Sequence, residues 1–91
     1  MNIIKFTIFF SFFLFILSGQ TSLNQISNKI SNNALAIYKT DKKEAISLSR
    51  QALVAHPSNA YAWAVAGNIL RKNEKFDEAE SFFQKSLELN P

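Results

Sequence analysis

The chain has 91 residues, 47% of them hydrophobic, and its ten Lys and Arg against seven Asp and Glu give a formal net charge of +3. This length allows one small domain, and the charge is too small and too dispersed for a nucleic-acid-binding surface. Because the chain has no cysteine, disulfides, zinc–thiolate sites and lipid attachment at an N-terminal cysteine are excluded.

The beginning of the chain is strongly apolar. Lys5 precedes the apolar run Phe6 to Leu17 (FTIFFSFFLFIL), and small and polar residues follow from Ser18. A positive start, a short apolar core and a small-residue region are typical of a secretory signal peptide. The run is shorter than the roughly 17–25 residues that a membrane-spanning helix needs.

Two other interpretations of this segment stay open. An uncleaved membrane anchor would contact lipid through residues 3–17, and a buried core helix is disfavoured because the run has no polar face. We therefore expect residues 1–20 to be a signal peptide or a membrane anchor. The protein would then be exported across the membrane or anchored in it, on its periplasmic or extracellular side.

Residues 21–57 carry the pattern of a helix pair. Apolar residues recur at spacings of three, four, four and three, at Leu23, Ile26, Ile30, Ala34 and Ile37. This periodicity indicates one face of a helix. Asp41 with Glu44 can cap a second helix over about residues 42–55. Pro57 ends that helix, because proline cannot donate the next helical hydrogen bond.

Residues 58–91 contain a spaced set of aromatic and small residues. They follow the order W-x-x-x-G, A-x-x-x-F and P, at Trp63, Gly67, Ala79, Phe83 and Pro91. The pattern resembles the tetratricopeptide repeat, a unit of 34 residues that forms a helix–turn–helix. The resemblance implies helices over about residues 60–72 and 76–90, and a non-catalytic scaffold that binds other proteins.

The same period connects the two helix pairs. Ala45 and Ala79 are 34 residues apart, and so are Pro57 and Pro91. The resemblance therefore extends to residues 21–57 as a degenerate unit. A strict 34-residue spacing places Asn33 opposite Gly67, whereas deleting one residue in the turn places Ala34 there. We prefer the second alignment, because small and apolar residues then fall where packing needs them.

Packing explains the residue types of the last pair. Gly67 has no side chain, so the second helix can approach closely beside Ala79. The remaining volume is expected to be filled by larger residues: Trp63, Leu70, Phe76, Phe83 and Leu87. We interpret Trp63 and Phe83 as core residues and not as a ligand box.

The resemblance also implies a groove lined by the first helix of each unit, in which a peptide would lie. In the last unit this groove would hold Tyr61, Ala64, Asn68, Arg71 and Lys72. The preceding unit would add Asn28, Ser31, Leu35, Tyr38 and Lys39. Asn68 stands where family members that bind C-terminal carboxylates often have asparagine, but Ala64 replaces their lysine, so we do not expect that clamp. The mixture of tyrosine, asparagine and basic side chains in this groove suits an extended peptide with some acidic residues. The alternative is an ordinary solvated surface.

No motif for catalysis is present. His56 is the only histidine, and it adjoins Pro57 in a turn without a serine or carboxylate at catalytic spacing. The sequence has no phosphate-binding loop and no metal-ligand cluster, so we expect no enzyme activity, cofactor or metal. The cations near the second turn are expected to be neutralised by acids on the same surface: Glu74, Asp77, Glu78 and Glu80.

These observations predict an all-α fold of two antiparallel helix pairs, arranged as in a tetratricopeptide solenoid, behind an N-terminal hydrophobic helix. The expected function is a protein–protein interaction scaffold for a protein or peptide partner. Such arrays usually need at least three repeats. The last helix would therefore leave apolar residues in solvent, and the alternatives are self-association through that helix or a fragment of a longer repeat protein.

Overall fold

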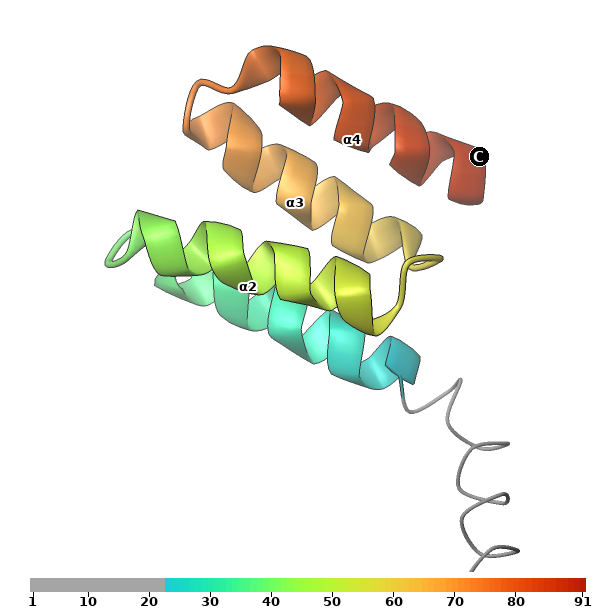
Figure 1. The fold of residues 1–91 in the computed structure, drawn as a ribbon, viewed down its shortest axis with the longest axis horizontal. Coiled ribbons are helices and arrows are strands. Elements are labelled where there is room, and N and C mark those ends of the chain that lie inside the picture. The colour runs from blue at the N-terminus through green and yellow to red at the C-terminus, as the bar shows by residue number, and fades with distance from the viewer. Residues whose placement is uncertain (1–22) are drawn as a thin grey trace, which may run out of the picture.

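The computed structural model describes residues 23–91, which form four helices connected by short turns (Figure 1). The first helix covers the described residues 23–37. It is followed by α2 at Lys42–Ala55, α3 at Ala60–Lys72 and α4 at Phe76–Leu89. The all-α fold is therefore confirmed for this part of the chain. The apolar segment at residues 1–20 lies outside the described residues, so its helix and its role stay predictions.

The helix ends follow from local sequence. The Asp41 side chain accepts a hydrogen bond from the Glu44 backbone N–H at 3.0 Å and so caps α2, as predicted. Asn59 caps α3 in the same way, since its side chain accepts from the Tyr61 N–H at 3.2 Å. A side-chain acceptor at this position satisfies one of the N–H groups that a helix start leaves unpaired. The prediction for α4 was one residue too long, because Asn90 is its C-terminal cap.

The second helix of each pair repeats at a constant distance along the chain. Both α2 and α4 have 14 residues, and Lys42 precedes Phe76 by 34 positions (76 − 42). The turn before α2 covers residues 38–41, whereas the turn before α4 covers residues 73–75. The extra residue therefore lies in the earlier turn. Ala34 is fully buried and Asn33 is exposed, which agrees with the alignment that places Ala34 opposite Gly67.

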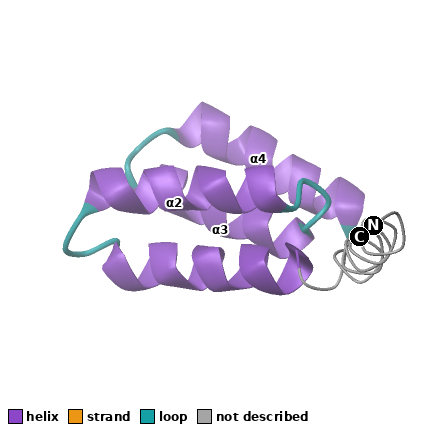
Figure 2. Ribbon diagram, turned by 60° about the horizontal axis from the view of Figure 1, so that its bottom comes forward, coloured by secondary structure: helices purple, strands orange, loops and turns teal. Residues whose placement is uncertain are grey.

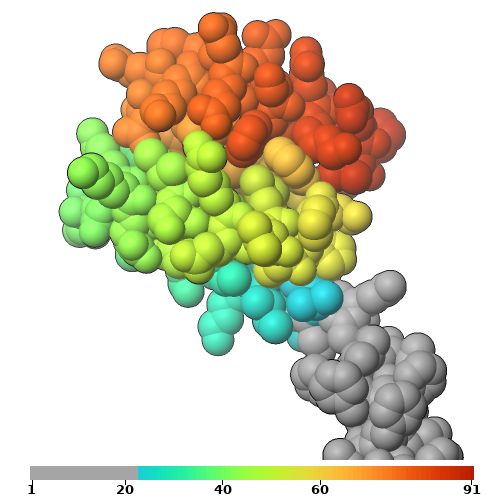
Figure 3. Space-filling model, in the orientation of Figure 1, coloured from blue at the N-terminus to red at the C-terminus, as the bar shows by residue number. Residues whose placement is uncertain are grey.

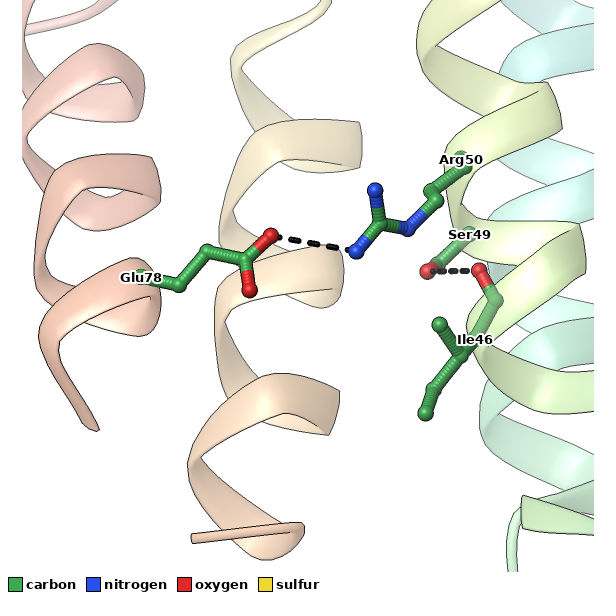
Figure 4. Close-up of polar contacts among 4 residues, drawn as sticks. All are labelled: Ile46, Ser49, Arg50 and Glu78. Carbon is green, nitrogen blue, oxygen red and sulfur yellow. Dashed lines mark hydrogen bonds and ion pairs between the residues drawn. The ribbon is translucent and has the colours of Figure 1, made fainter. Parts of the chain in front are cut away.

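The four helices form two layers. Consecutive helices lie side by side with turns at alternating ends (Figure 2). In the space-filling view α2 and α4 cover most of the visible face of the bundle, and only a little of α3 shows between them (Figure 3). Arg50 of α2 reaches across to Glu78 of α4 with 3.0 Å between its guanidinium nitrogen and the carboxylate oxygen (Figure 4). We call α2 and α4 the outer layer, and the first helix with α3 the inner layer.

At Gly67, α3 and α4 pack too closely for a side chain. A Cβ atom at this position would lie 2.8 Å and 2.9 Å from two ring carbons of Phe83, and 3.3 Å from the Ala79 carbonyl oxygen. Distances under about 3 Å are repulsive, so this contact requires glycine. The expected packing of Gly67 against Ala79 and Phe83 is confirmed.

Three residues expected in the core are less buried than predicted. Phe76 and Leu87 are 61% and 63% exposed, because they lie on the side of α4 that no described helix covers. Trp63 is only half-buried. It packs edge-on against Phe82 with ring centres 5.0 Å apart, and its indole N–H donates to the Pro57 carbonyl at 2.7 Å.

The face that the first helix buries agrees with the expected one at Ala34, which is fully buried, but differs from it near the start of the helix. Leu23 and Ile26 are 42% and 48% exposed, whereas Ser27 and Ser31 are fully buried. The Ser27 hydroxyl donates to the Ala52 carbonyl of α2 at 2.7 Å. A small side chain that bonds the neighbouring backbone permits closer contact between helices than isoleucine would. No described helix has both the length and the apolar character to cross a membrane.

Replacing Gly67 by leucine should destabilise the described bundle. Helix propensity alone predicts a gain, because glycine in a helix costs about 1 kcal/mol relative to alanine. Overpacking against Phe83 should outweigh that gain and cost about 1–3 kcal/mol net. Thermal unfolding followed by circular dichroism would measure it. Ser81→Leu, at an exposed position of α4, is the control, and a Gly67→Leu protein as stable as this control would contradict the packing at Gly67.

Candidate partner-binding face

Asn59 connects the two helices of the inner layer at one end. It is 7% exposed, and besides capping α3 its side-chain amide donates to Ser27 Oγ at 3.0 Å and to Asn28 Oδ1 at 2.8 Å. Both acceptors belong to the first helix. The Asn59 side chain therefore caps the N-terminus of α3 and also holds it against the first helix.

Tyr61, two residues after Asn59 in the first turn of α3, adds a second connection. Its hydroxyl donates to Asn32 Oδ1 of the first helix at 2.6 Å. Both residues are exposed, so the hydrogen bond lies on the surface that the two helices share. The Tyr61 ring thereby lies across the seam between the inner-layer helices.

Tyr38 connects the same two helices at their other end. Lys72 Nζ, at the end of α3, lies 5.2 Å from the centre of the Tyr38 ring, and Lys42 Nζ of α2 lies 6.0 Å from it. A cation within about 6 Å of an aromatic face is attracted by the electron-rich ring. The half-buried tyrosine is thus placed between two lysines from different helices.

Asn68 lies between these two contacts. Residues 61, 68 and 72 are seven and four positions apart, so they lie on one side of α3. Arg71 donates from its guanidinium to Asn68 Oδ1 at 2.7 Å. This pair extends the polar surface toward Lys72. We call the whole surface the inner face, and it comprises Asn28, Asn32, Tyr38, Tyr61, Asn68, Arg71 and Lys72.

The structure brings together five of the six residues predicted for partner binding: Tyr38, Tyr61, Asn68, Arg71 and Lys72. The sixth, Lys39, is exposed in the next turn, and within residues 23–91 no hydrogen bond or ion pair joins it to the others. Ser31 was also expected in the groove and is instead fully buried, with a hydroxyl that has no described hydrogen-bond partner. That a partner binds at this face stays a prediction.

Two residues of this region were missed in the sequence. Asn32 was not included in the predicted groove, although it follows Asn28 by four positions and so lies on the same side of the helix. Asn59 was not considered, although an asparagine just before a helix is a typical cap. Its contacts with the first helix involve residues about thirty positions away in the chain, and no local pattern predicts them.

The other residues that the sequence predicted to be important lie between the helices or at their ends. Ala45 and Ala79 are buried between helices, while Pro57 and Pro91 are exposed beyond the ends of α2 and α4. His56 is the C-terminal cap residue of α2, and its Nδ1 is buried without a described partner. Within residues 23–91 no group of three or more His, Asp and Glu side chains could hold a metal ion.

These features define a class of protein: a bundle of antiparallel helix pairs that presents a polar surface of its inner helices. Residues 60–91 match the family described as Tetratricopeptide repeat. That match covers about a third of the chain, and together with the four-helix arrangement it supports a tetratricopeptide repeat protein. A search of curated proteins found no match.

Replacing Asn59 by alanine should destabilise the protein more than replacing Asp41, the cap of α2. Loss of a cap alone costs about 0.5–2 kcal/mol, and Asn59→Ala also removes two hydrogen bonds to the first helix, so we expect about 2 kcal/mol or more. Asp41 is exposed and makes only the cap bond, so Asp41→Ala should cost about 1 kcal/mol.

Denaturant unfolding of both variants would measure this difference. Asn59→Asp is the matched control, because it keeps the cap acceptor and loses the two donated bonds. If Asn59→Ala were no more harmful than Asp41→Ala, the contact between Asn59 and the first helix would have no energetic importance.

Proposed function

We propose that this chain is a non-catalytic protein-binding module that holds a peptide segment of a partner on its inner face. The proposal rests on two contacts: the hydrogen bond from Tyr61 to Asn32, and the packing of Lys72 against the Tyr38 ring. Because of these contacts, the first helix and α3 present one continuous surface. The match of residues 60–91 to the Tetratricopeptide repeat family supports it, since such repeats generally bind protein partners. A preformed surface also reduces the conformational entropy lost on binding.

We also propose that residues 21–57 form a second, degenerate repeat and that the module works outside the cytoplasm or at a membrane. The 34-residue offset between α2 and α4 supports the first part. The order of Lys5, the apolar run and the polar residues from Ser18 supports the second. Whether residues 1–20 are cleaved or stay as an anchor is answered by N-terminal sequencing of the mature protein.

Combined replacement of Tyr61, Asn68 and Lys72 by alanine should abolish binding to the inner face. A random peptide display selection on the full chain would supply the ligands, and fluorescence anisotropy would compare affinities. We expect at least about tenfold weaker binding, because three contact side chains are lost together. A matched triple variant in the outer layer, at the exposed residues Lys43, Gln51 and Glu80, should bind normally. Equal binding by both variants would place the site elsewhere.

A second candidate function is self-assembly through α4. Phe76 and Leu87 are exposed on this helix, and a paired apolar surface of this kind can mark an interface. This alternative predicts a mass that rises with protein concentration in the absence of any ligand. Static light scattering of the full chain in a non-ionic detergent would detect it. Leu87→Lys should return the mass to that of one chain if α4 is the contact, and a constant mass in the unmodified protein would exclude this function.

A further inference from the structure

Hydrogen bonds join all four described helices at one end of the bundle. Ser27 of the first helix donates to the Ala52 carbonyl of α2 at 2.7 Å, and Asn59, just before α3, donates to Ser27 at 3.0 Å. Ser86 of α4 donates to the Ala60 carbonyl of α3 at 2.8 Å. The start of the first helix, the end of α2, the start of α3 and the end of α4 therefore lie together, as Figures 1 and 2 show.

Charge is scarce in the half of the bundle that contains these helix ends. This half, which we call the apolar end, consists of residues 23–30, 49–66 and 83–91. The remaining described residues, 31–48 and 67–82, form the charged end. The two halves are of similar size, but the charged end holds twelve Lys, Arg, Asp and Glu side chains. The apolar end holds only four: Lys29, Arg50, Lys85 and Glu88.

Most of the charges at the apolar end are paired. Lys85 Nζ lies 3.8 Å from a carboxylate oxygen of Glu88, and Arg50 lies 3.0 Å from Glu78 of the charged end. Among the described residues, Lys29 is therefore the one charged side chain of the apolar end outside an ion pair. The exposed surface at this end carries little net charge, and what it carries is positive.

Exposed apolar side chains are concentrated at the same end. Leu23 and Ile26 of the first helix are 42% and 48% exposed, and Val54 of α2 is 82% exposed. The hydrogen bond from Ser27 to Ala52 places the helix ends that carry them side by side. The other exposed large hydrophobic residues of the described chain are Tyr61 and Leu87, also at the apolar end, and Phe76 at the charged end.

The apolar run of the sequence ends close to this surface. Leu17 is the last residue of the run and Leu23 the first described residue, so five residues connect them. Even fully extended, this connection spans at most about 20 Å. A run held in a membrane would therefore keep the apolar end beside the lipid headgroups. An unpaired lysine such as Lys29 suits that position, because anionic headgroups attract cations.

We propose that the apolar end lies on a lipid bilayer, with Leu23, Ile26 and Val54 inserted into the boundary between headgroups and acyl chains. This inference rests on the proposed membrane anchor and adds the orientation of the bundle. The helix axes then point away from the bilayer, and the inner face extends from the lipid surface into water. A bilayer is favoured over a second copy, because the short connection keeps this end at the lipid at any protein concentration.

The test measures which end of the bundle is near lipid. The ¹⁵N-labelled full chain is reconstituted into nanodiscs of phosphatidylcholine and phosphatidylserine, with and without a nitroxide on the lipid headgroup. The nitroxide broadens nearby amide resonances, and its effect falls steeply with distance. We expect residues 23–29 and 53–58 to lose most of their signal intensity, while residues 38–44 and 71–77 keep theirs.

Matched variants separate lipid contact from simple tethering. Ile26→Gln combined with Val54→Gln should lower the ratio of docked to undocked bundles about tenfold, since two apolar side chains leave the lipid boundary. The signals of the apolar end should then recover toward those of the charged end. Phe76→Gln removes an exposed apolar side chain from the charged end and should change nothing. Circular dichroism verifies the fold, and Val54→Gln alone replaces the double variant if that variant does not fold.

Three results would overturn this orientation. The first is equal broadening at both ends, or a pattern that the double variant leaves unchanged, because the tether alone would then explain it. The second is a dependence of the apolar-end resonances on the protein-to-lipid ratio without the nitroxide, which would indicate a second copy. The third is cleavage of residues 1–20 in the mature protein. In each case the protein-binding module would stand, because peptide affinity at the inner face is measured separately.

Discussion

The inner face depends on Asn59. Its side chain starts α3, and the same amide bonds Ser27 and Asn28 of the first helix. The two inner helices also meet in the core, where Ala34 belongs to the same buried cluster as Val65 and Ile69 of α3. On the exposed surface they are joined by the hydrogen bond of Tyr61 and the stacking of Lys72. Exposed contacts are individually weak. A buried amide with all of its partners in place is stronger and fixes one arrangement. Asn59 therefore fixes the register of the two helices at one end, and the buried cluster of Ala34, Val65 and Ile69 maintains it further along.

The close contact at Gly67 fixes the other half of the bundle. With no side chain on α3 at this point, Phe83 of α4 lies where a Cβ would be. The earlier unit achieves a similar approach with different residues, since Ala34 is buried and Ser27 bonds the backbone of α2. The two helix pairs pack closely with different residue types, because what the packing needs is small volume and not one particular residue.

The sequence predicted the bounds of α2, α3 and α4 to within one residue because the signals are local. Asp41 and Pro57 act through the backbone of their neighbours, so no tertiary information is needed. The buried face of the first helix was predicted correctly at Ala34 and wrongly at Leu23 and Ile26, because hydrophobicity ranks leucine and isoleucine above serine. In the structure Ser27 is buried in place of an apolar residue, and its hydroxyl donates to the Ala52 carbonyl of α2. Phe76 was assigned to the core because it is apolar. It is exposed because no described helix covers its side of α4.

The candidate site was predicted in part for a comparable reason. Tyr61, Asn68 and Lys72 share one side of a helix, which spacing alone establishes. Which residues of the first helix they meet depends on the register between helices. Tyr38 was assigned correctly to that surface, whereas Asn32 and Asn59 were missed. Their roles arise from contacts between residues about thirty positions apart, and these contacts are fixed only when both helices are in place.

The acids of the described helices all lie in the outer layer, and the order of the helices explains part of this distribution. Acids stabilise the start of a helix and cations its end, because the backbone dipoles add along the axis. Accordingly Asp77 and Glu78 lie in the first turn of α4, and Arg71 and Lys72 lie in the last turn of α3. A short turn connects these two helix ends, so acids and cations gather at the same end of the bundle. The dipole does not require Lys72 to lie over Tyr38, in the turn after the first helix, nor Glu78 to reach α2. Those two contacts place Glu78 in an ion pair with Arg50 and Lys72 against an uncharged ring, and no described carboxylate forms an ion pair with Lys72.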